Sequence, residues 1–186
     1  MNVVDRAALE LIQDIQHPIL DEVALLISHS TSYAVLFLIW ILLIHFKKNE
    51  LSLNMLTGLI IEGAITLTLK TVIGRPRPIS RDLRPNMSFP SGHTSRSTYL
   101  ALLFNNRWSK KLLWFSLASM SIFSRIYLRV HHFTDILGGI AVGYFAYWIV
   151  MKYKLGEKVY EKIYEKIPVV KDILKPNTQT RNQSQK

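Results

Sequence analysis

Residues 133–151, FTDILGGIAVGYFAYWIVM, form an apolar run whose charged residue, Asp135, lies at its start. A helix needs about 20 such residues to cross the hydrocarbon core of a membrane. Four further runs approach that length: about Ser30 to Phe46, Leu51 to Lys70, Ser91 to Phe104 and Leu112 to Leu128. The sequence therefore predicts an all-α fold, an integral membrane bundle of about five transmembrane helices.

The N-terminal segment has a different pattern. Within Val3 to Ile27, one side of a helix would carry four apolar residues, Val4, Ala8, Leu11 and Ile15, while Asp5, Glu10 and Asp14 lie elsewhere. We expect an N-terminal amphipathic helix on the membrane surface, and a poorly hydrophobic first span is the alternative.

The C-terminal segment is amphipathic and then polar. Apolar residues recur every four positions over Leu155 to Ile167, which predicts a short interfacial helix, and Pro176 to Lys186 has the composition of a disordered tail. We therefore divide the chain into a membrane domain, residues 1–154, and a cytoplasmic tail, residues 155–186.

Basic residues are unevenly distributed in this chain, which has a net charge of +10 although 49% of its residues are hydrophobic. In an alternating five-span topology the lysine-rich connections share one side, which the positive-inside rule assigns to the cytoplasm. The other side then carries six arginines: Arg75, Arg77, Arg81, Arg84, Arg125 and Arg129. We expect these arginines to form an extracytoplasmic phosphate site, because guanidinium groups hold phosphate oxygens through paired hydrogen bonds. Membrane lipid and phosphate account for the charge, so no nucleic-acid partner is expected.

The first segment that contains candidate functional residues is 70–78, Lys-Thr-Val-Ile-Gly-Arg-Pro-Arg-Pro, at the end of the second predicted span. Its prolines stop the helix and stiffen the exit, which holds Lys70 and Arg77 in place. For Lys70 alone, an interaction with lipid head groups would be the preferred interpretation. Glu62 lies two helical turns before Lys70, either as a structural partner within the bundle or as a support for the site.

The second segment, residues 90–93, Pro-Ser-Gly-His, comes just before a predicted helix. The first N–H groups of a helix have no internal partner, and Gly92 allows an anion to approach the backbone closely. Ser91 can donate its hydroxyl to that anion, and His93 can protonate a departing oxygen. Alternatively, Ser91 only caps the helix and His93 is an interfacial histidine.

The third segment, residues 124–135, places His131 four residues before Asp135, on one face of a helix that begins there. An aspartate that accepts a hydrogen bond from one ring nitrogen leaves the other nitrogen ready to attack. Metal ligation by His131, His132 and Asp135 is the alternative, but it leaves the arginines unexplained. Cysteine is absent, which excludes thiolate ligands. We expect neither a metal nor another cofactor.

Taken together, Lys-x6-Arg-Pro, Pro-Ser-Gly-His and Ser-Arg-x5-His-x3-Asp resemble the three-part signature of the type 2 phosphatidic acid phosphatase superfamily, which also includes vanadium haloperoxidases and glucose-6-phosphatase. The match covers about Lys70 to Asp135, and every signature position is filled. The resemblance implies a helical bundle whose three segments meet at one membrane face. It further implies that Lys70, Arg77, Ser91, Gly92 and Arg125 bind phosphate, with His131 as nucleophile, Asp135 as its orienting partner and His93 as general acid. Many membrane relatives have six spans where we find five, so this chain differs from them in its N-terminal segment.

The expected activity is hydrolysis of the terminal phosphate of a lipid phosphate or diphosphate through a phosphohistidine intermediate, in the cell membrane. A polyprenyl diphosphate such as undecaprenyl or dolichyl diphosphate is the favoured substrate, because the site is expected to face outward and the chain has no large soluble domain. The alternatives are phosphatidic acid, phosphatidylglycerol phosphate or a soluble ester as substrate, or a non-catalytic membrane protein that only binds lipid phosphate.

Overall fold

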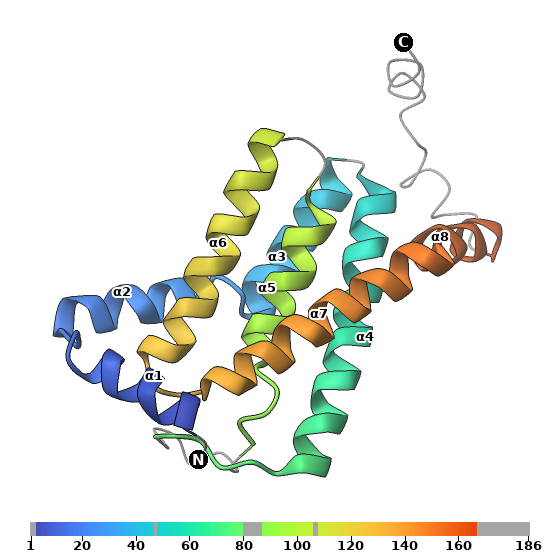
Figure 1. Ribbon diagram of the computed structural model, residues 1–186. Coiled ribbons are helices and arrows are strands. Elements are labelled where there is room, and N and C mark those ends of the chain that lie inside the picture. The colour runs from blue at the N-terminus through green and yellow to red at the C-terminus, as the bar shows by residue number, and fades with distance from the viewer. Residues whose placement is uncertain (1–2, 47, 80–86, 106–107, 167–186) are drawn as a thin grey trace.

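The computed structural model describes residues 3–46, 48–79, 87–105 and 108–166, and within these ranges the chain forms eight α-helices (Figure 1). In chain order they are Val3–Gln13 (α1), Pro18–His29 (α2), Tyr33–His45 (α3), Asn49–Ile73 (α4), Gly92–Leu103 (α5), Trp108–Tyr127 (α6), Phe133–Tyr153 (α7) and Leu155–Lys166 (α8). The predicted all-α fold is confirmed. Each of the five predicted apolar runs corresponds to one helix, from α3 to α7.

Two of the described helices, α4 and α7, are each long and apolar enough to cross a membrane alone. Helices α2 and α3, which meet at a bend of 46°, form a third candidate span when taken together. Helix α5 is only 12 residues long and rich in serine and threonine, and α6 carries Lys111 and Arg125. The number of five spans therefore stays a prediction.

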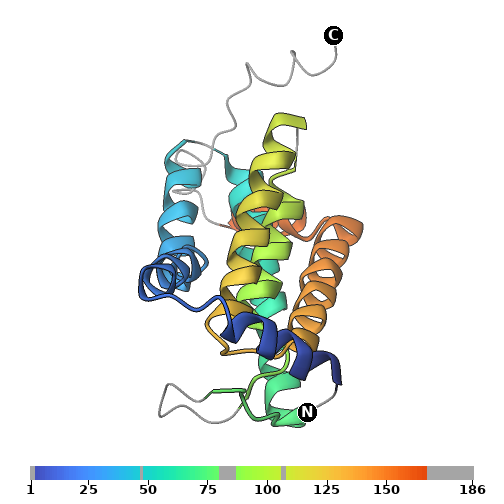
Figure 2. The same ribbon diagram turned by 60° about the vertical axis from the view of Figure 1, so that its left-hand side comes forward.

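The N-terminal segment is two helices, so the prediction of one amphipathic helix over Val3 to Ile27 is wrong in its extent. The first helix ends at Gln13, and Pro18 begins the second, where the side chain of His17 accepts a hydrogen bond from Ile19 N–H. A proline suits the first turn of a helix but breaks a helix interior, which explains the division. Figure 2 shows α1 lying across the end of the bundle.

The C-terminal segment forms a helix over nearly the range that the sequence predicts. Helix α8 packs against α4, and its Gly156 is buried beside Asn54. The predicted disorder of residues 176–186 lies outside the described part of the chain.

Helix α5 lies at the centre of the bundle, where it packs against α4, α6 and α7. Its contact with α7 depends on two small residues four positions apart, Gly139 and Gly143. A Cβ atom added to Gly139 would lie 2.6 Å from the carbonyl oxygen of Ser91, and one added to Gly143 would lie 2.3 Å from that of Ser95. Small residues at this spacing let two helices approach backbone to backbone in a membrane. The close packing fixes the start of α5 against the start of α7.

We predict that Gly143→Ala lowers the free energy of unfolding by about 1–3 kcal/mol, because the new methyl group meets backbone that cannot move aside cheaply. The thermal midpoint of the purified protein in detergent measures the effect. Gly63→Ala is the matched control, since its added Cβ meets only the end of the Tyr33 side chain, at 3.2 Å. Equal midpoints for the two variants would contradict the close α5–α7 contact.

Candidate active site

The three signature segments meet at one end of the bundle, where α4 and α6 end and α5 and α7 begin (Figure 1). Helix α4 stops at Gly74, which has the left-handed backbone conformation (φ 56°) that favours glycine. The chain then turns across the end of the bundle through Pro76 and Pro78. This turn places the residues that follow α4 next to the start of α7, although the two segments are far apart in the sequence.

Hydrogen bonds tie the turn after α4 to the other two segments. Ser88 donates its N–H to the carbonyl of Arg75 (2.7 Å), and Ile79 donates its N–H to the carbonyl of Arg129 (3.2 Å). The Nε2 atom of His132 lies 3.1 Å from the carbonyl oxygen of Pro76. The three segments therefore form one connected unit.

His131 and Asp135 lie together at the start of α7, as their four-residue spacing predicts. The Nδ1 atom of His131 is 3.5 Å from Oδ2 of Asp135, which is long for a hydrogen bond. The same carboxylate oxygen accepts a hydrogen bond from the backbone N–H of His132 at 2.9 Å. Contacts of this kind are commonly long before substrate binds, so the geometry suits an orienting role for Asp135.

The imidazole of His131 is 2% exposed. The pKa of His131 is lowered to about 4, mainly by burial. The contact with Asp135 acts in the opposite direction and raises this pKa, whereas the positive charges of Arg125, Arg77 and Lys70 lower it further. An imidazole is neutral above its pKa, so His131 carries no positive charge at neutral pH. Because Asp135 lies beside Nδ1, Nε2 is the ring nitrogen that this carboxylate leaves uncovered.

The second segment forms the start of α5. Ser91 is the N-cap of this helix, and its Oγ accepts hydrogen bonds from Thr94 N–H (3.5 Å) and from the Thr94 hydroxyl (3.0 Å). The capping role that the sequence left as an alternative is therefore real. Both contacts use Oγ as an acceptor, which leaves the hydroxyl proton of Ser91 for a phosphate oxygen. The Ser91 N–H in turn donates to the carbonyl of Asp135 at 3.0 Å.

His93 lies in the first turn of α5 and is half-buried. The positive charges whose electrostatic fields reach it include Arg125, Arg96 and Arg77, and the His131 ring is among the groups that influence it. The two histidines of the signature are thus brought to the same place, although 38 positions separate them in the sequence.

The three predicted cationic residues also point to this region. Lys70 donates its Nζ hydrogens to the carbonyls of Met87 and Ser88, at 2.8 and 3.2 Å. Arg77 donates to the carbonyl of Val130 at 3.4 Å. Arg125 donates to the hydroxyl of Ser28, while its buried Nε has no partner within the described part of the protein. A buried donor without a partner costs free energy, which suggests a place for an anion.

Glu62 lies in α4, two helical turns before Lys70, and it contacts α5 near the site. It is fully buried, and its Oε1 accepts hydrogen bonds from Ser95 and from Thr66. Ser95 also bonds to the carbonyl of Gly92, at 3.2 Å. Glu62 is therefore a structural partner whose hydrogen bonds extend to the start of α5, so the two interpretations left open by the sequence are compatible.

Sequence reasoning missed two further residues of this end of the bundle. Arg75 is expected from the sequence only as one of six arginines near a phosphate site, yet its guanidinium donates to Asp135 Oδ1 (2.8 Å) and to Asp5 Oδ2 (2.5 Å). Asp5 of α1 is fully buried, although we had placed it on the polar side of a surface helix. The usable signal was its spacing of seven residues from Ile12, which puts both on the buried face of α1.

Two of the six arginines, Arg81 and Arg84, lie outside the described residues. Arg129 has a left-handed backbone (φ 52°) that a non-glycine residue rarely adopts, at the bend before His131. Among the described side chains, no group of three or more histidines, aspartates or glutamates is arranged to hold a metal ion.

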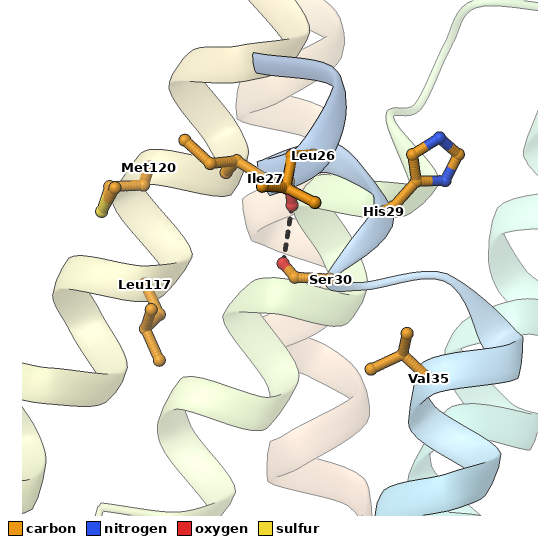
Figure 3. Close-up of a pocket in the computed structure, with 7 residues that line it drawn as sticks. All are labelled: Leu26, Ile27, His29, Ser30, Val35, Leu117 and Met120. Carbon is orange, nitrogen blue, oxygen red and sulfur yellow. Dashed lines mark hydrogen bonds between the residues drawn. The ribbon is translucent and has the colours of Figure 1, made fainter. Parts of the chain in front are cut away.

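An open apolar pocket of about 350 Å³ lies between α2, the start of α3 and the middle of α6 (Figure 3). Its lining includes Leu26, Ile27, Leu117 and Met120. Ser28, which accepts the hydrogen bond from Arg125, follows directly after Ile27. The apolar lining of the pocket and the residue that contacts Arg125, a predicted phosphate ligand, are thus neighbours in α2.

The bundle has apolar helices and gathers cationic side chains, two histidines and an aspartate at one end. This arrangement is typical of a membrane phosphatase. Comparison with known proteins agrees. The chain belongs to the PAP2 superfamily, whose family model matches residues 51–158.

The similar proteins are lipid phosphatases. A lipid A 4'-phosphatase of Porphyromonas gingivalis is 28% identical over 75% of this chain and 68% of its own length. A decaprenylphosphoryl-5-phosphoribose phosphatase of Mycobacterium tuberculosis is 32% identical over 46% of this chain, and the match spans about half of that protein.

Solved structures share the fold. The crystal structure of Aquifex aeolicus LpxE superposes with a TM-score of 0.72 at 27% identity, over 82% of this chain and all of that chain. A PAP2-type phosphatidylglycerolphosphate phosphatase from Bacillus subtilis has a TM-score of 0.71 at 24% identity, over 81% and 84% of the two chains.

Proposed function

We propose that this protein removes the terminal phosphate from a membrane lipid by way of a phosphohistidine at His131. One observation carries the proposal: His131, Asp135 and His93 lie with Lys70, Arg77 and Arg125 at one end of the bundle. The phosphate oxygens would bind the three cations, the Ser91 hydroxyl and the backbone N–H groups at the start of α5. Such preorganised donors stabilise the charge that develops during phosphoryl transfer, and they make a metal unnecessary.

In the first step, Nε2 of neutral His131 attacks phosphorus, and the bond between phosphorus and the lipid oxygen breaks. His93 donates a proton to that oxygen as it leaves. Asp135 stabilises the positive charge that forms on the imidazole of His131.

In the second step, a water molecule attacks the phosphohistidine and the bond between nitrogen and phosphorus breaks. His93, which has given up its proton, accepts one from the water. The cycle ends with inorganic phosphate and both histidines in their original states.

Two classes of substrate fit. A polyprenyl diphosphate remains the candidate favoured by the sequence, and the names of the relatives above add lipid A and decaprenylphosphoryl-5-phosphoribose. The apolar pocket between α2, α3 and α6 suits the hydrocarbon chain of either class. We place the site on the extracytoplasmic face from the distribution of lysine and arginine. Cleavage of an impermeant substrate by inverted vesicles but not by intact cells would contradict that orientation.

A substrate panel tests the proposal. We expect the purified protein to release phosphate from at least one of polyprenyl diphosphate, lipid A, phosphatidic acid and phosphatidylglycerol phosphate, and less readily from glucose-6-phosphate. Activity should be unchanged in excess chelator and blocked by vanadate, which mimics the pentacoordinate phosphoryl group. Activity that chelator abolishes and zinc or magnesium restores would contradict the metal-free mechanism. Phosphate binding without release from any substrate would favour the non-catalytic alternative.

A further inference from the structure

Helix α1 inserts one charged side chain into the end of the bundle. Asp5 is 0% exposed, although four apolar residues of the same segment, Val3, Val4, Leu11 and Ile15, are 51–84% exposed. Burying a carboxylate is costly unless charged or hydrogen-bonded partners compensate it. The contacts of Asp5 therefore indicate why it is there.

Both oxygens of Asp5 contact Arg75 or the start of α7. Oδ1 accepts a hydrogen bond from the backbone N–H of Thr134 at 3.0 Å, and Oδ2 accepts one from Arg75 Nη2 at 2.5 Å. The Thr134 hydroxyl lies 3.1–3.2 Å from the two oxygens. Thr134 is in the first turn of α7, where N–H groups have no partner within the helix and attract an anion. Burial raises the pKa of Asp5, but the Thr134 and Arg75 contacts outweigh it and hold that pKa below its usual value.

Arg75 connects this carboxylate to the one beside His131. Its Nη1 donates to Asp135 Oδ1 at 2.8 Å, while its Nη2 donates to Asp5. The planar fork of a guanidinium holds two carboxylates in a fixed geometry, which the single ammonium of a lysine does not provide. With Oδ1 of Asp135 fixed by Arg75, its Oδ2 is directed toward His132 N–H and His131 Nδ1.

We propose that Asp5 is a positioning residue for catalysis, which acts through Arg75 to hold Asp135 in the orientation that His131 requires. The N-terminal helix α1 then contributes a residue to the site. This inference rests on the proposed function of His131 and Asp135.

Asp5 has an electrostatic as well as a geometric effect. Arg75 lies between two negative charges, so its positive charge is shared. Without the charge of Asp5, Arg75 would pair with Asp135 alone and draw that carboxylate away from His131. Asp135 would then stabilise the imidazolium less well during attack, whereas Lys70, Arg77 and Arg125 would still bind phosphate.

The test compares Asp5→Asn, Arg75→Lys and the double variant with wild type, on the substrate of the panel that wild type cleaves fastest. Asn keeps the shape of Asp5 without its charge, and Lys keeps the charge of Arg75 without its fork. We expect each single variant to lose about 10–100-fold in kcat, as is typical when a group that orients a catalytic residue is removed. KM and the vanadate inhibition constant should change by less than about threefold, because the phosphate ligands are intact. The double variant should be no slower than the slower single variant, because both residues act through one contact.

Asp14→Asn is the matched control, since Asp14 lies just beyond α1 and is exposed. It should keep the wild-type kcat. A wild-type kcat in Asp5→Asn, or a weakening of vanadate inhibition in proportion to the loss of kcat, would overturn the positioning role. If Asp5→Asn does not fold, Arg75→Lys decides alone, and an unchanged kcat there overturns the proposal. Failure of the proposed function would differ, because wild type and Asp14→Asn would then release no phosphate either.

Discussion

His131→Ala should abolish turnover of every substrate, with kcat reduced by at least about 10⁴-fold, because no covalent phosphoenzyme can form without the attacking nitrogen. The loss should be the same for lipid and aryl phosphates, since all of them depend on this attack. Steady-state phosphate release from purified protein measures it, and vanadate binding verifies that the phosphate ligands are in place.

The matched control is His45→Ala at the exposed end of α3, which should retain wild-type kcat. Substantial activity of His131→Ala would mean that another group or water attacks phosphorus directly.

His93→Ala should lose about 10²–10⁴-fold in kcat/KM on an alkyl monophosphate, because an alkoxide leaves poorly without a proton. On p-nitrophenyl phosphate the loss should be much smaller, since that leaving group is stable as an anion. The variant should also accumulate phosphohistidine on the aryl ester if His93 activates the hydrolytic water. Comparison of the two substrates in kcat/KM, which reports formation of the phosphoenzyme and departure of the leaving group, measures the effect.

The division of roles between the histidines depends on this comparison. Equal losses on both substrates in His93→Ala and His131→Ala, with no phosphoenzyme in either, would contradict it.

Local sequence signals predicted much of the fold and site. The apolar runs gave the positions of α3 to α7, and Gly74, Pro76 and Pro78 correctly marked a turn out of α4. The four-residue spacing of His131 and Asp135 placed both at the start of α7, because a helical repeat fixes which residues share a face. The assignment of chemical roles to these residues stays a prediction.

The contacts of the N-terminal segment could not be predicted in this way. An amphipathic pattern shows that a helix has two faces, but it does not show what each face meets. Asp5 is paired with residues 70 and 129 positions away, a separation that no local pattern encodes. Pro18 is the local signal that marks the break between α1 and α2.

The most direct test of the mechanism is rapid chemical quench of wild type with substrate labelled at the terminal phosphate. We expect an acid-labile, base-stable phosphoenzyme to appear at the rate of turnover or faster, with the label on His131 after peptide mapping, and no label in His131→Ala. Rapid turnover without any labelled enzyme, or a label on a different residue, would contradict the phosphohistidine mechanism.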